Sequence, residues 1–211
     1  MVESGGEVKG SAVWFWAVDA VDFETPVQNL EDEVRALWAD TEANRSYLDA
    51  LQTGTDEVRR RRLCAVRLLG QTLARVGVEP SAESLGRQTM GKPCLPGRED
   101  VDISLSHSDG YVACGVLVGG GRIGVDVEEY ARLTEERAAR MAERYFANVA
   151  CDGDEPVTRA FVRLWTLREA VCKLDGKGDP LRIDVTAIPE SVWRYTRPTD
   201  GGFVTVAVEC K

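Results

Sequence analysis

The chain has 211 residues, 44% of them hydrophobic, which is enough to bury the core of one domain or of two small domains that share a core. Its 35 acidic and 26 basic residues give a net charge of −9, so we expect no broad electrostatic attraction to nucleic acid or to an anionic membrane. No apolar run approaches the ~20 residues of a membrane-spanning helix, and the first ten residues lack a secretion-signal pattern.

The cysteine and histidine content argues against a zinc site and for a reducing compartment. His107 is the single histidine, and the cysteines form no C-x-x-C pair. We therefore predict reduced cysteines and a cytoplasmic protein. The six cysteines are Cys64, Cys94, Cys114, Cys151, Cys172 and Cys210.

The first predicted elements are a strand and a long helix. Residues 11–18 are β-branched and aromatic, which is typical of a strand. Residues 57–76 have apolar positions at intervals of three and four, which predicts an amphipathic helix that ends near Gly77. Its arginines at 59–62 span the circumference of a helix, so they either form a solvated face or place one or two guanidinium groups at an anion-binding site.

A loop and a hairpin follow. The segment "GKPCLP" (91–96) has the glycine and prolines of a loop, and residues 101–120 alternate like two strands joined by a turn at 108–110. Ser106 and His107 lie near the tip of this hairpin. No Ser-His-Asp or Cys-His constellation accompanies them, so a surface position for His107 stays open beside a functional one.

The segment "RIGVDVEEY" (122–130) reads as a strand that places two carboxylates on one face. Ile123, Val125 and Val127 point one way, whereas Asp126 and Glu128 point the other. The polar face could be solvated, as on an edge strand, or it could face a common site.

The rest of the chain repeats the pattern of helices and strands. Residues 134–149 and 158–174 have helical spacing, and the last 29 residues alternate around a turn at 199–202. Each half thus combines helix and strands, which predicts an α+β fold of two similar lobes that meet near 119–121. We expect an N-terminal lobe at 1–120 and a C-terminal lobe, with the metal site, at 121–211.

The predicted helix at 158–174 carries an acid and a base on one face. Trp165, Glu169 and Lys173 are spaced at four residues, and the last two could simply form an i,i+4 salt bridge. Together with Asp126 and Glu128, however, Glu169 completes three carboxylates, a set of hard oxygen ligands suited to Mg²⁺. Lys173, one turn further on, would reach the same bound phosphate.

These residues resemble a known family. The pattern I-G-V-D-x-E at 123–128 and the pattern W-T-x-x-E-A-x-x-K at 165–173 resemble the two signature motifs of 4′-phosphopantetheinyl transferases, and Glu169 follows Asp126 by 43 positions. The segments "GKPCLP" and "ISLSHSDGYVACGV" resemble the coenzyme A-binding loop and Ser-His hairpin of the pseudo-dimeric, surfactin-synthetase-activating branch. The resemblance covers roughly residues 57–185. At position 168, just before Glu169, this chain has arginine where the family usually has lysine.

The resemblance implies two similar lobes in a pseudo-twofold arrangement and a Mg²⁺-dependent transferase. Such an enzyme moves the 4′-phosphopantetheine arm of coenzyme A to a serine of an acyl or peptidyl carrier protein and releases 3′,5′-ADP. By similarity, Asp126, Glu128 and Glu169 would bind the metal, and Glu169 would also accept the serine proton. Lys173 would neutralise the phosphate, so Asp126, Glu169 and Lys173 form the expected catalytic set.

The resemblance also implies a coenzyme A site. His107 would donate to the pyrophosphate, Lys92 and Arg61 would hold the 3′-phosphate, and Ser106 would be a supporting contact beside Lys173. Because carrier proteins are usually acidic, as this chain is, apolar contacts should guide docking. Candidates are Met141, Tyr145 and Phe146, with burial in the core as the alternative.

Three other interpretations stay open. A Mg²⁺-dependent phosphohydrolase would use the same carboxylates and lysine with water as acceptor. A non-enzymatic binding module would not depend on Asp126. An inactive or specialised family member is the third, and Arg168 is the departure that would support it. A pseudo-dimer within one chain predicts a monomer.

Overall fold

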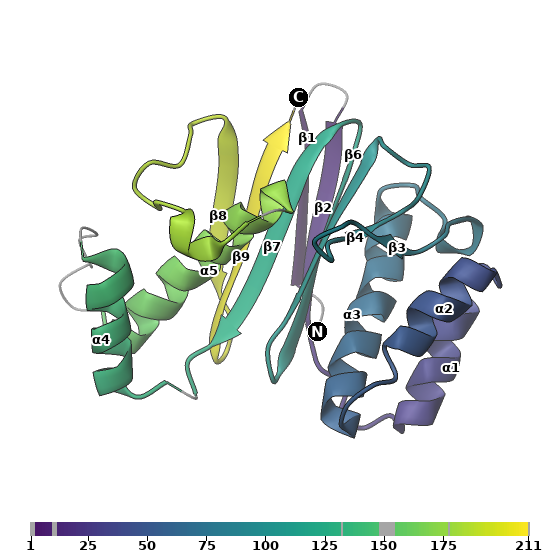
Figure 1. Ribbon diagram of the computed structural model, residues 1–211, viewed down its shortest axis with the longest axis horizontal. Helices are drawn as coiled ribbons and strands as arrows, with labels where there is room; N and C mark the ends of the chain where they lie inside the picture. Colours follow the sequence, from purple (N-terminus) through teal and green to yellow (C-terminus); the bar gives the residue numbers. More distant parts are fainter. Residues whose placement is uncertain (1–2, 10–11, 132, 148–154, 177, 211) are drawn as a thin grey trace.

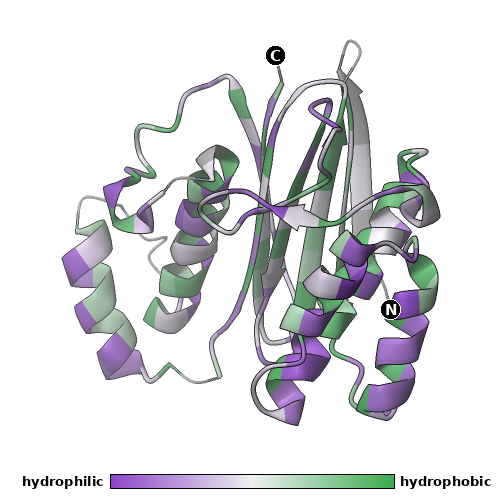
Figure 2. Cartoon of the chain, turned by 45° about the vertical axis from the view of Figure 1, so that its right-hand side comes forward, coloured by the Kyte–Doolittle hydropathy of each residue, from purple (hydrophilic) through white to green (hydrophobic). Residues whose placement is uncertain are grey.

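The computed structural model describes residues 3–9, 12–131, 133–147, 155–176 and 178–210. The chain forms a mixed α/β structure in which two antiparallel sheets lie back to back and helices cover both outer faces (Figure 1). Hydrophilic residues gather on the outer helices, and hydrophobic residues on the strands between them (Figure 2). In the described part of the chain, no helix combines the length and apolar character needed to cross a bilayer.

The first sheet has the strand order β1-β2-β6-β5, and three helices lie on its outer face (Figure 1). Its strands are β1 (Glu3–Lys9), β2 (Ala12–Ala20), β5 (Val101–His107) and β6 (Tyr111–Val118). The helices are α1 (Val27–Leu37), α2 (Glu42–Ala50) and α3 (Asp56–Arg75), and a short 3-10 turn (Pro80–Ala82) precedes the small hairpin β3 (Gly86–Arg87) and β4 (Pro93–Cys94). The predicted strand at 11–18, helix at 57–76 and hairpin at 101–120 are confirmed.

The second sheet has the order β7-β9-β8 and is covered by two helices. Its elements are β7 (Gly121–Glu129), α4 (Glu135–Phe146), α5 (Val157–Asp175), a 3-10 turn (Pro180–Arg182), β8 (Val192–Pro198) and β9 (Gly202–Cys210). In both sheets the strand before the helices pairs with the second strand of the later hairpin, β2 with β6 and β7 with β9. Residues 148–149 of the predicted helix at 134–149, and Cys151, lie outside the described residues. Cys64, Cys94, Cys114 and Cys210 are free thiols.

The sequence did not predict strand β1, helix α2 or the short strands β3 and β4, the last of which lies in the segment expected to be a loop. The segment ESGGEVK has neither alternation nor β-branched residues at most positions. It is extended because it pairs along its whole length with β2, from Glu3 opposite Val18 to Lys9 opposite Ala12. Pairing with a neighbouring strand, rather than local propensity, determines this strand.

The core between the sheets fixes the orientation of β7. Ile123, Val125 and Val127 are fully buried against Trp14 and Leu117 of the first sheet, as their shared face predicted. On the opposite face of β7, α5 covers Gly124 and Asp126, which are buried, whereas Glu128 is half-buried and lines a cavity. This close contact needs Gly124, because a Cβ atom there would lie 1.9 Å from the carbonyl oxygen of Ala170 in α5.

Candidate active site

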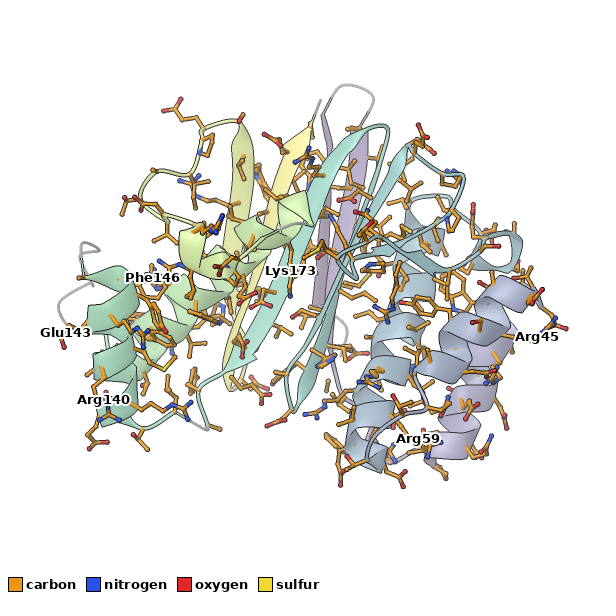
Figure 3. The ribbon with its side chains drawn as sticks, viewed as in Figure 1. Arg45, Arg59, Arg140, Glu143, Phe146 and Lys173 are labelled. Carbon is orange, nitrogen blue, oxygen red and sulfur yellow. The ribbon has the colours of Figure 1, made fainter. Side chains whose placement is uncertain are left out.

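A cavity of about 840 Å³ opens where α3, the β3–β4 loop, β5, β7 and α5 meet. Seven of the eight residues predicted for the site line it, and Arg61 is the exception. Lys173 lies at the centre of the molecule, whereas Arg59 lies at the far end of α3 (Figure 3). The seven are Lys92, Ser106, His107, Asp126, Glu128, Glu169 and Lys173.

Asp126 is the centre of a buried polar cluster. Its side chain is 4% exposed, and its Oδ1 accepts hydrogen bonds from Lys173 Nζ at 2.7 Å and from Ser106 Oγ at 2.8 Å. Lys173 Nζ also donates to Ser106 Oγ at 3.0 Å. Three elements, β5, β7 and α5, therefore converge on one carboxylate.

The charge of Asp126 disfavours the charged forms of the other two carboxylates of the cavity, Glu128 and Glu169. Burial, followed by the charge of Asp126, raises the pKa of Glu128 to about 7. The same two causes raise the pKa of Glu169, and Lys173 opposes them. Asp126 Oδ2 is buried and has no hydrogen-bond partner among the described residues. A bound cation would relieve both the repulsion and the unpaired oxygen.

The donor set suits Mg²⁺, which takes a few carboxylate oxygens and completes its shell with water and phosphate. Among the described residues, no group of three or more His, Cys, Asp or Glu side chains is already gathered as a metal centre. Asp126, Glu128 and Glu169 share the cavity wall, but Oδ1 of Asp126 bonds to Lys173. The metal role of these three residues stays a prediction.

His107 lies at the end of β5 and is exposed to the cavity. Partial desolvation of its ring by the cavity wall lowers its pKa, and the positive charges of Arg61, Lys173 and Arg62 lower it further. The ring is therefore neutral at pH 7 in the free protein, and several cations surround the place where an anion would bind.

The structure separates the adjacent arginines of α3. Arg61 forms an ion pair with Asp109 in the turn after His107, whereas Arg62 lines the cavity and donates to the carbonyl oxygen of Thr53 at 2.9 Å. The sequence could not resolve this choice, because one residue on a helix turns the side chain by about 100°.

Lys92 lines the cavity, but its ammonium is held inside the protein. Its side chain is 8% exposed, and Nζ bonds to Asp102 at 2.6 Å and to the carbonyl oxygen of Ile123 at 3.1 Å. The sequence analysis did not single out Asp102. The available signal was the polar face of β5, where Asp102, Ser104 and Ser106 occur at every second position.

Arg168 points away from the carboxylates. It donates to the carbonyl oxygen of Tyr145 at 2.7 Å, and its guanidinium lies 4.2 Å from the ring centre of Phe146 in α4. The departure from the family pattern therefore lies on the α4 side of α5. Phe146 is 5% exposed and Met141 packs in the same cluster, so burial explains these two candidate docking residues.

Comparison with known proteins shows the family of this chain. Residues 122–202, which hold both signature motifs, match the 4′-phosphopantetheinyl transferase superfamily. The chain is 33% identical over 125 residues to 4′-phosphopantetheinyl transferase Sfp of Bacillus subtilis, covering 56% of this chain and 54% of that protein. It is 30% identical over 169 residues to 4′-phosphopantetheinyl transferase HetI of a Nostoc species, covering 75% of this chain and 67% of that protein.

The chain belongs to the 4′-phosphopantetheinyl transferase superfamily. Another similar protein, a 4′-phosphopantetheinyl transferase of Bacillus subtilis, is 30% identical over 124 residues. The chain spans about half the length of the two Bacillus relatives.

Proposed function

We propose that this protein transfers the 4′-phosphopantetheine arm of coenzyme A to a serine of an apo acyl or peptidyl carrier protein. The observation that carries this proposal is the cluster of Ser106, Asp126 and Lys173 in a cavity that Glu128 and Glu169 also line. Phosphoryl transfer needs carboxylates that bind a metal, a lysine that neutralises phosphate charge and an acidic side chain that accepts the proton of the nucleophile, and this cavity brings such groups together.

Asp126, Glu128 and Glu169 would hold Mg²⁺, which when bound neutralises charge on the pyrophosphate oxygens of coenzyme A. Lys173 already lies beside Asp126 and can reach a phosphate oxygen in the same cavity. His107 donates to the pyrophosphate, and Ser106 keeps Asp126 and Lys173 in place.

Glu169 accepts the proton of the carrier serine, directly or through a water molecule. The serine oxygen bonds to the phosphorus that carries pantetheine, the P–O bond to 3′,5′-ADP breaks, and the proton passes to Glu169. The raised pKa of Glu169 supports this role, because a general base works best when its pKa approaches the working pH.

For the 3′-phosphate of coenzyme A, we assign Arg61 together with its neighbour Arg62 on the cavity wall.

We also propose the division into lobes at 1–120 and 121–211, related by an approximate twofold axis. The equivalent orders β2-β6-β5 and β7-β9-β8 support it. The monomeric state and the cytoplasmic location stay predictions, as does the choice between acyl and peptidyl carriers.

Intact-mass spectrometry of an apo carrier protein, incubated with this protein, coenzyme A and Mg²⁺, tests the proposal. The carrier should gain the mass of one phosphopantetheine, and EDTA should prevent the gain. Hydrolysis of coenzyme A without any gain on the carrier would instead support a phosphohydrolase. No gain on any carrier of either class, with no coenzyme A binding, would overturn the assignment.

A further inference from the structure

Among the described residues, no strand pairs with the edge of β7 that faces β5, although the two strands are in contact. β7 pairs with β9 on its other edge. An unpaired strand edge inside a protein would leave backbone N–H and C=O groups without hydrogen bonds, which is costly. Side chains solve this problem here.

Two side chains of β5 accept hydrogen bonds from backbone N–H groups of β7 that point away from β9. The Ile123 N–H donates to Asp102 Oδ2 at 2.7 Å, and the Val125 N–H donates to Ser104 Oγ at 2.9 Å. Both acceptors lie on the polar face of β5, two residues apart, and their partners on β7 are also two residues apart. This match sets the register of one strand against the other.

Two lysines satisfy the carbonyl groups along the same edge. Lys92 Nζ donates to the Ile123 carbonyl at 3.1 Å, and Lys173 Nζ donates to the Val125 carbonyl at 3.2 Å. Lys92 is also ion-paired with Asp102, and it lies 3.5 Å from the carbonyl oxygen of Leu174 in α5. Lys92 therefore links the β4 segment, β5, β7 and α5.

The register places the reacting groups. Ser106 continues the polar face of β5 beyond Ser104, and its hydroxyl meets Asp126, the residue after Val125. A slip or separation of β7 relative to β5 would move Asp126 away from Ser106, and it would move the carbonyl that anchors Lys173.

From these contacts we propose that Lys92, Asp102 and Ser104 are positioning residues for the transfer reaction. They hold β7 against β5 in the register that places Asp126 and Lys173. This inference rests on the proposed function and assigns Lys92 to this network instead of to the 3′-phosphate of coenzyme A. The three residues are called the seam residues below.

Substrates with and without the 3′-phosphate separate the two roles of Lys92. For Lys92→Met we expect kcat to fall by ~10-fold or more with coenzyme A and by the same factor with 3′-dephospho-coenzyme A, since misplacement affects both. The ratio of their KM values should match that of the wild type. A loss confined to coenzyme A, expressed in KM, would show that Lys92 binds the 3′-phosphate and would overturn its positioning role.

Asp102→Asn is the milder companion, because an amide oxygen can still accept the Ile123 N–H while the ion pair is lost. We expect it to retain more kcat than Asp102→Ala, with KM for coenzyme A within about twofold of wild type in both. Equal kcat in Asp102→Asn, Asp102→Ala and the wild type would contradict the proposal.

Ser104→Ala removes one hydroxyl from the seam, and Thr72→Ala is its matched control. Thr72 is also a buried hydroxyl, but it bonds to Leu68 within α3. Ser104→Ala should lower kcat by ~10-fold or more and weaken Mg²⁺ binding measured by calorimetry, whereas Thr72→Ala should change neither. Identical behaviour of the two variants would overturn the inference.

The wild-type protein, assayed in parallel, distinguishes failure of this inference from failure of the proposed function. Without transfer by the wild type, the proposed function itself fails. With wild-type transfer and seam variants equal to Thr72→Ala, only the positioning role fails.

Discussion

Asp126 shows how one side chain combines structural and chemical demands. Its Oδ1 accepts hydrogen bonds from Lys173 and Ser106, while its Oδ2 is buried and has no partner in the part of the chain that the structure describes. An unsatisfied buried carboxylate oxygen is costly, and such groups are typical of sites that bind a ligand. The nearby Glu128 has its pKa raised to about 7 by burial and by the negative charge of Asp126, so the two carboxylates repel each other when both are ionised.

Replacing Asp126 should abolish transfer. We expect Asp126→Asn to retain less than about 1% of wild-type turnover, because the neutral amide is a poor Mg²⁺ ligand and no longer pairs with Lys173. The intact-mass assay at saturating Mg²⁺ measures this, and near-ultraviolet circular dichroism checks that the fold persists. Substantial turnover by a folded variant would contradict the metal role.

Coenzyme A binding should depend on pH through His107. Its pKa lies below the ordinary 6.5, so the ring is neutral at pH 7 and a bound pyrophosphate would favour its protonated form. Binding then takes up a proton, and affinity should rise as the pH falls, by at most about tenfold per unit.

Calorimetric titrations from about pH 8 to about pH 6 measure this slope for the wild type and for His107→Asn. The phosphates of coenzyme A titrate identically in both, so the difference between the two slopes belongs to His107. Equal slopes would show that His107 takes up no proton when coenzyme A binds and would contradict this pH dependence.

At the scale of elements, the contact between α5 and β7 is the decisive one. α5 presents Glu169 and Lys173 on one face, as their spacing predicted, and Gly124 allows the helix to approach β7 closely enough for Lys173 to reach Asp126. The sequence placed the acids and the base on their elements. It did not reveal that the polar face of β7 would be covered by α5.

Gly124→Ala should therefore damage both stability and activity. The new Cβ would lie 1.9 Å from the Ala170 carbonyl oxygen, so α5 must move or the strand must bend. We expect a loss of about 2 kcal/mol or more in the free energy of unfolding, as for other overpacked sites. Urea unfolding measures it. Gly77→Ala is unsuitable as a control, because Gly77 has a φ of +77° that alanine rarely adopts. Ala82→Gly is the control instead: it exchanges the same two residue types in reverse, at an exposed position of the 3-10 turn Pro80–Ala82.

An unchanged stability of Gly124→Ala, relative to the wild type, would mean that the helix does not pack closely on β7. A loss of activity without any loss of stability would instead confine the role of Gly124 to the site.

For the whole molecule, the core between the two sheets couples the proposed lobes. Leu117 of β6 is fully buried in it, beside Val125 and Val206 of the second sheet. Leu117→Ala should lower the free energy of unfolding by about 2–5 kcal/mol through lost burial and a residual cavity. Because both sheets lose the same contact surface, they should still unfold in one transition.

Hydrogen exchange followed along a denaturant series monitors the two sheets separately. Coincident transitions for β6 and β9 are the expected result. If one sheet unfolded well before the other, the lobes would be independent units and the shared core would contribute little to either.

The sequence by itself determined the helical and strand faces and the chemical types of the site residues. Periodicity of two put Asp126 and Glu128 together, and periodicity of four put Glu169 with Lys173, because these rules depend on local backbone geometry. The family motifs added the class of reaction that these residues would perform. Strand β1 lacked such a local signal and became a strand only by pairing with β2.

Only the tertiary structure decided how these elements meet. Lys92 bonds to groups as distant in sequence as Leu174, and Asp102 bonds to Ile123, so their partners depend on how two sheets and a helix dock. The same docking selected Arg62 rather than Arg61 for the cavity wall and turned Arg168 toward α4. Local periodicity carries no information on such long-range contacts, because burial of the shared core sets them.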